Sequence, residues 1–574
     1  MAKKRDTKKI EDTKAIEDTK GMKDTKEARE TKAPKAAAAP KAPKAPKAPK
    51  APKAPKAATK PRARTKRTAS TGTTGTISTS TLSTLSTIST PSTDRLDILF
   101  ITPEARPFAK TGGLADVGGA LPLALARLGH HVTVVVPAYK GTPTDGAVGE
   151  AAQVPFGMNN YPVRFIEQRV ADGVTGVLVD APALYDREGL YGDQHGEFGD
   201  NAFRFAVLSR AALEYARIRG RRPSAIHAHD WQAALAPVYA RTALRDDAII
   251  GGVRTVLTIH NLAFQGMFDA RELGWIGLGA DLYQPHLLEF YGRASALKGG
   301  IVFSDVITTV SPTYAREILT PEYGFGFDGI LRSREQDLLG ILNGIDTATW
   351  DPRADPHLSV HFDAHSLDKK RDLKRLLLER AGLLADEAAM ARPLIGIVTR
   401  LTHQKGCDLF SSAADRLMQF DASWVMLGSG DAWCEDLWRT LAGRFPERVS
   451  ARIGFDEDLA HLIEAGSDLF LMPSWYEPCG LNQMYSLRYG TLPVVRATGG
   501  LQDTVSDPNE SVTDATGFKF RHYTAEGLIW AVSRALDLYR DEPDQWRIMQ
   551  RNGMAKDFSW DVSAREYVKV YRGL

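Results

Sequence analysis

From Asp94 onward the chain follows one recurring pattern, in which short continuous apolar runs alternate with longer amphipathic stretches. A continuous apolar run is typical of a strand buried on both faces of a sheet, and its alternation with helical patterns is typical of a parallel sheet. In the first half this pattern predicts a helix near residues 117–129 and strands at residues 96–102, 131–137, 174–180, 225–229, 254–260 and 306–310.

The pattern starts again near Pro393, with predicted strands at residues 394–399, 423–428, 449–455, 468–473 and 491–496. Such a restart predicts an α/β protein with two doubly wound, Rossmann-like domains. We assign residues 94–345 to the first domain and residues 346–556 to the second. Residues 557–574 are interpreted as a C-terminal helix that packs back on the first domain.

Residues 1–93 carry neither pattern. Residues 1–32 repeat Asp-Thr-Lys, residues 41–56 repeat Lys-Ala-Pro, and 18 of the 26 residues from 68 to 93 are Ser or Thr. Because no segment here has an apolar face that could offset the entropy of ordering, we predict a disordered tail with a stiff proline-rich spacer.

The charge also separates this tail from the rest of the chain. The whole sequence carries a net charge of +3, yet residues 1–68 hold 23 Lys and Arg against 8 Asp and Glu, so the remainder is acidic. Clustered lysines favour weak, salt-dependent binding of polyanions, whereas a solubilising tether explains the same composition and is the interpretation we favour. The eight acidic residues among the first 30 disfavour a plastid transit peptide.

Composition excludes several classes of protein. Of the 574 residues, 43% are hydrophobic and 25% are charged, which is typical of a soluble globular protein. No apolar run reaches the roughly 18 residues of a membrane span, so no membrane partner is expected. The three cysteines, Cys407, Cys434 and Cys479, are too few and too scattered for a disulfide framework or a zinc site. We expect a cytoplasmic protein.

Polar clusters lie where predicted strands end. In doubly wound sheets ligands bind outside the carboxyl ends of the strands. Both domains are therefore expected to present chemistry to one interdomain cleft. The clusters are residues 109–113, 227–231, 260–261, 400–406, 473–483 and 497–500.

The segment Lys110-Thr111-Gly112-Gly113 has the components of an anion-binding loop. Glycines let backbone N–H groups approach a phosphate, the following helix contributes its positive end, and lysine adds a charge. The spacing fits neither a GxxxxGK[ST] loop nor a GxGxxG fingerprint, which disfavours the ordinary nucleotide-binding interpretations. A purely structural strand-to-helix turn is an equal alternative.

Three further residues could stabilise charge. Arg400 and Lys405 share a loop after a predicted strand, where both could neutralise a diphosphate leaving group or simply be solvated cations. Glu477 lies in a tight turn before a predicted helix, where it could bind sugar hydroxyls, face a cationic transition state or serve as an ordinary helix-start glutamate.

Two histidines suggest metal or proton-transfer chemistry. His227 and His229 precede Asp230, but no further ligand stands at metal spacing, and a single buried histidine is usually a hydrogen-bonded core residue. Neither a metal nor another cofactor is expected.

Taken together, these segments resemble a known family. KTGGLADV, HAHDW, HNLAFQG, VSPTYAREI, RLTHQKG, EPCGLNQ and TGGLQDTV are similar to motifs of bacterial glycogen synthases and plant starch synthases, and the resemblance runs from about Asp94 to Leu574. It implies the two-domain GT-B fold. It also implies transfer of glucose from ADP-glucose to the non-reducing end of an α-1,4-glucan such as glycogen, with retention at the anomeric carbon.

The resemblance further implies which residues form the site. Its catalytic positions are Glu477, which holds the glucose, His229, which lies beside the reacting centre, and Arg400 and Lys405, which neutralise the diphosphate as it leaves. The substrate-binding positions are Lys110, Gly112, Gly113, Asp116, Asp200, Asn201, Asn343, Cys479, Gly480, Leu481, Thr498, Gly499 and Gly500.

One position departs from many retaining GT-B enzymes. Those enzymes pair the first glutamate with a second one eight residues later. This chain has Tyr485 at that position. Enzymes of the starch-synthase type also lack the second glutamate. A double displacement is disfavoured, because no carboxylate is clearly placed as the nucleophile. A same-face mechanism, in which the leaving phosphate takes the acceptor's proton, needs only cations and a dry cleft.

Other functions stay open at this point. A UDP-glucose-dependent synthase differs only in the donor, and a glucan phosphorylase would need lysine-bound pyridoxal phosphate. A dehydrogenase is disfavoured because no GxGxxG follows either first strand. A non-catalytic polyanion-binding protein would have lost one or more of Lys110, Arg400, Lys405 and Glu477, all of which are present.

Overall fold

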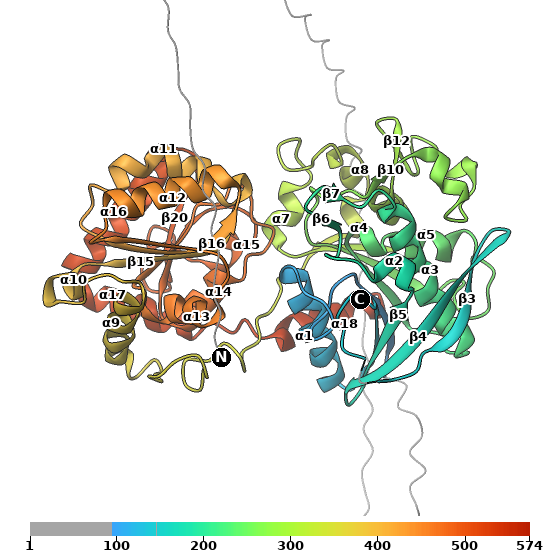
Figure 1. Cartoon of the computed structure of the whole chain (residues 1–574), viewed down its shortest axis with the longest axis horizontal. Coiled ribbons are helices and arrows are strands. Elements are labelled where there is room, and N and C mark those ends of the chain that lie inside the picture. The colour runs from blue at the N-terminus through green and yellow to red at the C-terminus, as the bar shows by residue number, and fades with distance from the viewer. Residues whose placement is uncertain (1–94, 145) are drawn as a thin grey trace, which may run out of the picture. The chain divides into compact units, whose positions relative to one another are not determined.

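The computed structural model describes residues 95–144 and 146–574 (Figure 1). The predictions for residues 1–93, both disorder and polyanion binding, lie outside the described residues. The described residues belong to one compact unit with two large sheets, one in the N-terminal half (residues 95–340) and one in the C-terminal half (residues 394–556). No helix in the described ranges is both long and apolar enough to cross a membrane.

The N-terminal sheet has nine strands in the order β14-β13-β9-β8-β1-β2-β5-β4-β3. From β14 to β5 every neighbouring pair is parallel, whereas β4 and β3 continue the sheet as an antiparallel hairpin at one edge. In chain order the strands are β1 (Asp97–Ile101), β2 (His131–Pro137), β3 (Glu150–Phe156), β4 (Asn159–Ala171), β5 (Val174–Asp180), β8 (Ala225–His229), β9 (Arg254–Ile259), β13 (Val306–Thr309) and β14 (Leu338–Gly340).

Strand β1 shows why the sequence needs continuous apolar runs. Leu99 and Ile101 belong to the core cluster that contains residues of α3 (Asn201–Ile218), whereas Phe100 belongs to the cluster on the opposite face with α1 (Gly113–Arg127). Successive side chains of a strand point to opposite faces, so a strand covered on both faces must be apolar throughout. Helix α18 (Trp560–Arg572), at the end of the chain, packs beside α1 on that second face.

The C-terminal sheet has six parallel strands in the order β17-β16-β15-β18-β19-β20. Helices α11 (Cys407–Leu417), α12 (Ala432–Arg444) and α16 (Ala525–Asp541) contribute to the core on one face, and α9 (Lys370–Arg380) and α13 (Glu457–Gly466) to the core on the other (Figure 1). The strands are β15 (Leu394–Leu401), β16 (Ser423–Gly430), β17 (Val449–Ile453), β18 (Leu469–Met472), β19 (Leu492–Arg496) and β20 (Phe518–Phe520).

The structure confirms every predicted strand and adds what the pattern did not reveal. Helix α1 begins at Gly113, earlier than the predicted residue 117, and the strand predicted at 449–455 ends at Ile453. The hairpin β3–β4 was missed because its exposed and buried residues are mixed, so it contains no continuous apolar run. The short strand β20 was also missed. Where the two domains divide stays a prediction.

The chain passes between the two halves twice, and the two passages lie side by side. Ile345 donates its backbone N–H to the carbonyl of Phe558 at 2.8 Å, and Ile345 forms a parallel bridge with Ser559. The first passage opens the connecting segment (residues 341–393), and the second leads into α18.

Candidate active site

One cavity of about 1010 Å³ is lined by both halves of the described chain. Its walls come from the loops that follow the carboxyl ends of β1, β8, β9, β15 and β18, together with α1 and α13. This is where doubly wound sheets place their ligands. The volume suits a ligand at the upper end of the range for small-molecule sites.

The loop of Lys110 lines the cavity, and its donors are partly occupied by an internal carboxylate. Glu104, buried at 3% exposure, accepts hydrogen bonds from the backbone N–H groups of Thr111 at 2.6 Å and Gly112 at 3.1 Å. Lys110 Nζ contacts both carboxylate oxygens of Asp116, at 2.8 and 3.0 Å. The sequence analysis did not identify Glu104, whose hydrogen bonds to the backbone fix the conformation of this loop.

Gly113 brings the two halves close together. A Cβ at this position would lie 3.6 Å from Leu481 Cδ1, so the first turn of α1 faces the turn that follows Glu477. Leu481, Cys479 and Gly480 all line the cavity, and their contacts with a substrate stay a prediction. Burial raises the pKa of the Cys479 thiol to about 12, which keeps it protonated and unreactive.

The charged residues of the C-terminal half converge as expected. Lys405 Nζ lies 2.6 Å from Glu477 Oε2, and Ser474 Oγ donates to the same oxygen at 3.0 Å. Arg400 also lines the cavity, but with the described residues its side chain makes only one long hydrogen bond, 3.5 Å to Gln404. Arg400 is therefore the cation of this group that is least engaged by the protein.

Gly406 makes this convergence possible. Its φ is +81°, and a Cβ would lie 2.2 Å from the carbonyl oxygen of Pro473. Only glycine combines that backbone conformation with so close an approach. The loop of Lys405 can thus pack directly on the loop that carries Glu477.

The histidines occupy the N-terminal wall. His229 is fully buried, its Nδ1 lies 3.0 Å from His260 Nε2, and its own Nε2 has no hydrogen-bond partner among the described residues. His260 and Asp230 line the cavity, whereas the side chain of His229 lies behind them. Burial, with smaller contributions from His227 and His260, holds the pKa of His229 well below its usual value, so the ring is neutral.

His227 is a hydrogen-bonded core residue. Its ring nitrogens lie 2.8 Å from Tyr571 OH, on α18, and 2.6 Å from Thr258 Oγ1, on β9. Asp230 has a φ of +54°, and burial raises the pKa of its carboxyl to about 7 although the backbone N–H of His260 donates to it at 2.7 Å.

Two predicted ligand residues lie away from the cavity. Asp200 pairs with Arg187 through two contacts of 2.8 and 2.7 Å, and Asn201 bridges the carbonyl of Tyr191 and the side chain of Arg204. Neither residue is part of the cavity wall. Asn343 does line the wall, and its buried Oδ1 has no hydrogen-bond partner in the part of the chain that the structure describes.

The segment Thr498-Gly499-Gly500 also lies outside the cavity wall, and its donors are used within the protein. The carboxylate of Glu317 accepts from Thr498 Oγ1 at 3.0 Å and from the backbone N–H of Gly499 at 3.1 Å. In return Asp503 accepts from Ser311 Oγ and Thr313 Oγ1, both at 2.6 Å. Helices α7 (Pro312–Glu317) and α15 (Gly499–Thr504) therefore cap each other across the two halves. We call these contacts the reciprocal caps.

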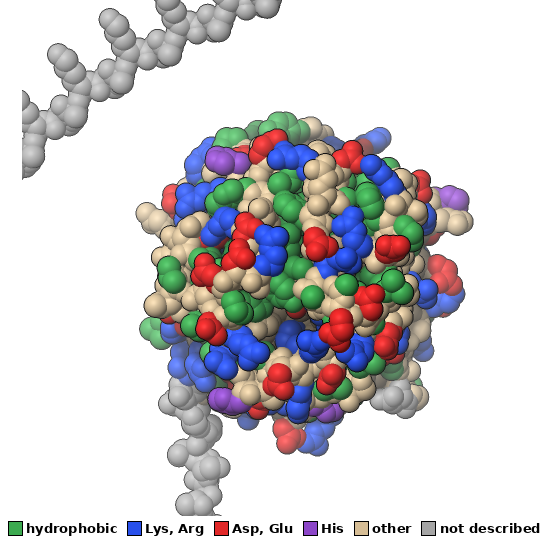
Figure 2. Space-filling view, turned by 90° about the vertical axis from the view of Figure 1, so that its left-hand side faces the viewer, with side chains coloured by type: hydrophobic (Ala, Val, Ile, Leu, Met, Phe, Trp, Pro, Cys, Tyr) green, Lys and Arg blue, Asp and Glu red, His purple; other side chains and the backbone are tan. Residues whose placement is uncertain are grey.

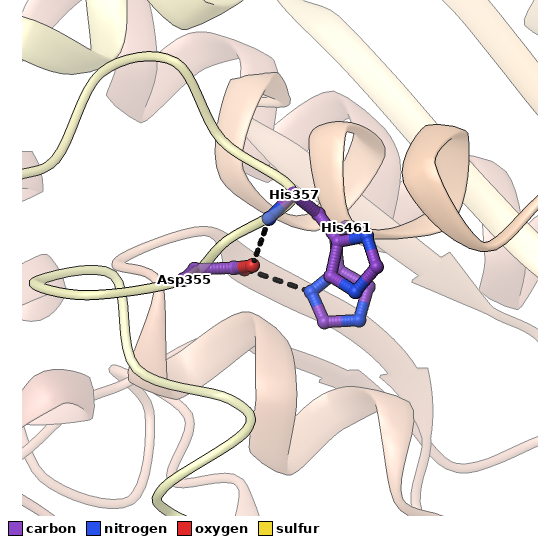
Figure 3. A group of neighbouring side chains, drawn as sticks. All are labelled: Asp355, His357 and His461. Carbon is purple, nitrogen blue, oxygen red and sulfur yellow. Dashed lines mark hydrogen bonds and ion pairs between the residues drawn. The ribbon is translucent and has the colours of Figure 1, made fainter.

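A second group of polar residues lies beside the cavity. Asp355, His357 and His461 bring possible metal-ligand atoms within 4.8 Å of one another (Figure 3). The carboxylate of Asp355 already accepts from the His357 backbone N–H at 2.9 Å, from His461 Nδ1 at 2.7 Å and from Tyr489 OH. His357 Nδ1 lies 2.6 Å from Asp458. The Asp355 carboxylate is engaged by three donors, whereas His461 Nε2 has no partner among the described residues; the engaged carboxylate fits a hydrogen-bonded core group better than a metal site.

Phe455 completes the wall near α13. Its side chain is 87% exposed although it is aromatic, and it lines the cavity just beyond the end of β17. An exposed ring at the edge of a cavity is a surface on which a nucleobase can stack. The sequence could have indicated Phe455 as a site residue, because it lies at the carboxyl end of the strand predicted at residues 449–455.

Family models match both halves of the chain. The starch synthase catalytic domain matches residues 97–333, and the model described as glycosyl transferases group 1 matches residues 385–552. The glycogen synthase of Koribacter versatilis is 46% identical over 478 residues, which cover 83% of this chain and 98% of the relative. The glycogen synthase of Anaeromyxobacter dehalogenans is 48% identical over 480 residues, which cover 83% of this chain and 99% of the relative.

Solved structures show the same likeness. The catalytic domain of starch synthase IV from Arabidopsis thaliana, bound to ADP and acarbose, has a TM-score of 0.76 and 35% identity, covering 83% of this chain and 99% of that one. Sucrose-phosphate synthase from Thermosynechococcus elongatus has a TM-score of 0.52 at 17% identity, which indicates a shared fold alone.

Proposed function

This chain belongs to the family of glycogen synthases and starch synthases and has the GT-B fold, and on that premise we propose that it transfers glucose from ADP-glucose to the non-reducing end of an α-1,4-glucan with retention of configuration. The observation that carries the proposal is the convergence of Arg400, Lys405 and Glu477 in one cavity opposite the loop of Lys110.

The cations would act on the leaving group. As the bond between glucose C1 and the diphosphate breaks, negative charge grows on the departing oxygen, and cations already in place stabilise it without reorganisation. Arg400 is free to make such a contact, and Lys405 reaches the cavity from a neighbouring loop. Lys110 would contact the donor in both the ground state and the transition state, and so would chiefly serve binding.

Glu477 would hold the transferred glucose. The residue is 5% exposed, and its carboxylate is oriented by Lys405 and Ser474, so it is preorganised toward the cavity. Because the His229 side chain lies behind the wall, we assign it a supporting role through its backbone and through His260. Thr498, Gly499 and Gly500 would reach the donor only if the reciprocal caps open.

A same-face mechanism fits these groups. The acceptor hydroxyl forms its bond to C1 on the side from which the diphosphate departs, and its proton passes to an oxygen of that diphosphate. Such a reaction needs a closed, dry site with fixed charges. The position eight residues after Glu477 holds the phenol of Tyr485 in the cavity wall.

The donor base would stack on Phe455, which supports a nucleotide as the ligand. Glycogen as the acceptor follows from the function of the family. We also propose a cytoplasmic location, which the three free cysteines support because reducing compartments preserve thiols.

The deciding experiment compares radiolabelled ADP-glucose and UDP-glucose as donors for glycogen, with Glu477→Gln protein as the matched control. We expect label in glycogen from ADP-glucose, released again by an α-1,4-specific glucosidase. A higher rate with UDP-glucose than with ADP-glucose would show that the donor is UDP-glucose and that the proposed donor is wrong. Incorporation only from glucose 1-phosphate, in a protein whose visible spectrum shows bound pyridoxal phosphate, would instead establish a phosphorylase.

A further inference from the structure

Three aromatic rings form a continuous stack beside the cavity. The Trp350 ring lies between the rings of His461 and Tyr485, with both centroid distances 3.8 Å and interplanar angles of 8° and 10°. The three rings come from the connecting segment, from α13 and from α14 (Asn482–Arg488), and all three residues line the cavity. Parallel rings at this spacing restrain one another's orientation.

The far end of the stack is held by buried hydrogen bonds. Asp355 and His461 are both 0% exposed, and Asp355 accepts from His461 Nδ1 and from Tyr489 OH (Figure 3). A carboxylate on one ring nitrogen fixes the plane of an imidazole and its tautomer. Because His461 stacks on Trp350 and Trp350 stacks on Tyr485, the fixed plane of His461 also restrains the plane of Tyr485.

The near end presents a hydroxyl group with no partner. Tyr485 is 8% exposed, and its phenol makes no hydrogen bond with any residue that the structure describes. Among the charged groups that act electrostatically on Tyr485, Asp116 and Arg106 belong to the opposite half, and Glu464 belongs to the same half. Burial first, and then the Asp116 carboxylate, raise the pKa of Tyr485 well above its usual value, so the phenol keeps its proton and can donate it.

The stack also has a defined place along the donor. His461 is on α13, the helix that follows Phe455, where the base would stack. Tyr485 is on α14, the helix that follows Glu477, where the glucose and diphosphate would lie. The wall between these two ends therefore faces the part of a nucleotide sugar that joins the base to the diphosphate. That part is the ribose.

We propose that the Tyr485 hydroxyl donates a hydrogen bond to a ribose hydroxyl of the nucleotide donor, and that Trp350 and His461 are positioning residues that hold the phenol for this contact. The inference rests on the proposed function, because it takes a nucleotide sugar as the ligand. It makes Tyr485 a specificity-determining residue at the position where related enzymes carry a carboxylate.

The test uses the full-length protein with ADP, 2′-deoxy-ADP and 3′-deoxy-ADP as probes in isothermal titration calorimetry. A neutral hydrogen bond of about 1 kcal/mol corresponds to about fivefold in Kd. We expect one deoxy probe to bind the wild-type protein about fivefold more weakly than ADP. Tyr485→Phe keeps the ring stack but loses the donor, so it should bind ADP about fivefold more weakly and no longer discriminate against that probe.

The positioning residues need a different comparison. Trp350→Leu removes the middle ring and should also abolish discrimination, whereas Trp350→Phe should restore part of it. Tyr539→Phe, which changes a tyrosine on α16 outside the cavity wall, is the matched control and should behave as wild type. In each active variant the change should appear in KM for ADP-glucose more than in kcat.

The outcomes separate the two proposals. If wild-type protein binds ADP and Tyr485→Phe discriminates between ADP and the deoxy probes as wild type does, the ribose contact is wrong while the proposed function stands. If wild-type protein binds no ADP and transfers no glucose, the proposed function fails and the ribose contact fails with it.

Discussion

At the scale of single residues, the site depends on pairs of opposite charge whose members lie far apart in the sequence. Glu477 and Lys405 form the closest such pair in the cavity wall, at 2.6 Å with side chains that are 6% and 17% exposed. Removing one member of a buried pair leaves the other without its counter-charge. A substitution here changes the electrostatics of the site as well as one contact.

Glu477→Ala should therefore reduce kcat by about 100-fold or more, the usual cost of losing a preorganised charge at the transition state. The residue lies on a loop, so the variant should still fold, but its melting temperature should fall because Lys405 loses its counter-charge. Steady-state rates with ADP-glucose and glycogen test the first expectation, and calorimetry tests the second. A variant that keeps more than about a third of wild-type turnover would show that Glu477 does not hold the reacting sugar.

The cations should differ in which kinetic constant they affect. Lys110→Ala should mainly raise KM for ADP-glucose, because a phosphate contact exists before and during reaction. Arg400→Ala and Lys405→Ala should mainly lower kcat, because charge on the leaving group grows as the bond breaks. Arg400→Ala is the cleaner test, since Lys405→Ala also leaves Glu477 unpaired. The opposite division of effects would overturn these roles.

Asp230 gives the molecule a pH-dependent stability. Burial raises the pKa of its carboxyl from 3.8 to about 7, so between these pH values the folded protein binds a proton that the unfolded chain releases. The contribution of this group to the free energy of unfolding therefore falls as pH rises from about 4 to 7, by up to about 4 kcal/mol.

Asp230→Asn isolates this effect, because asparagine tolerates the φ of +54° and can accept the same backbone hydrogen bond. Urea unfolding at pH 5 and pH 7 should show a smaller loss of stability in the variant than in the wild-type protein. Equal losses in both proteins would mean that the carboxyl at this position is not protonated in the fold.

At the scale of secondary-structure elements, the sequence predicted what a local pattern can encode. Strands such as β1 and β16 were predicted because they are buried on both faces and therefore apolar throughout. The hairpin β3–β4 has one exposed side, so its residues did not stand out. Site residues at strand ends, such as Arg400, could be predicted because parallel sheets place ligands there.

The contacts that the sequence did not reveal join distant segments. Glu104 fills the loop of Lys110, and Glu317 reaches the N–H of Gly499, 182 residues away. The sequence around Glu104 and Glu317 does not indicate which distant backbone groups their carboxylates will bind. For the same reason the sequence did not reveal Arg187 and Arg204 as the internal partners of Asp200 and Asn201, whose role in substrate binding stays a prediction.

The reciprocal caps of α7 and α15 make a testable element of their own. The loss of a helix cap typically costs about 1 kcal/mol of stability. Burial raises the pKa of the Glu317 carboxyl above its usual value, and Asp503 adds a smaller contribution in the same direction. Glu317→Ala and Asp503→Ala should each lower the free energy of unfolding by about 1–2 kcal/mol. Chemical denaturation measures this directly.

The matched control for the caps is Asp537→Ala, which removes an exposed ion pair on α16 and should cost less than about 0.5 kcal/mol. Because the caps join the two halves, Glu317→Ala should also make the α7 segment more accessible to hydrogen exchange. Protection that does not change in the variant would show that the caps do not hold the halves together.

At the scale of the whole molecule, two sheets share one cavity, and the chemistry depends on groups from both. Figure 2 shows one face of the protein on which cationic and anionic side chains are interspersed, without a continuous positive region. The described body therefore offers no large anion-binding surface on that face. Residues 1–68, with 23 Lys and Arg against 8 Asp and Glu, stay the segment predicted to bind polyanions.

Deleting residues 1–93 separates these two contributions. The match to the starch synthase catalytic domain begins at residue 97, and β1 begins at Asp97, so the core loses none of its strands. The truncated protein should fold and elongate glycogen at close to the full-length rate. The deleted segment includes the 23 Lys and Arg of residues 1–68, so weak retention on heparin, lost at high salt, should disappear with it. If truncation abolishes glucose transfer in protein that melts as the full-length chain does, the tail takes part in catalysis. If heparin retention survives, the anion-binding surface belongs to the body.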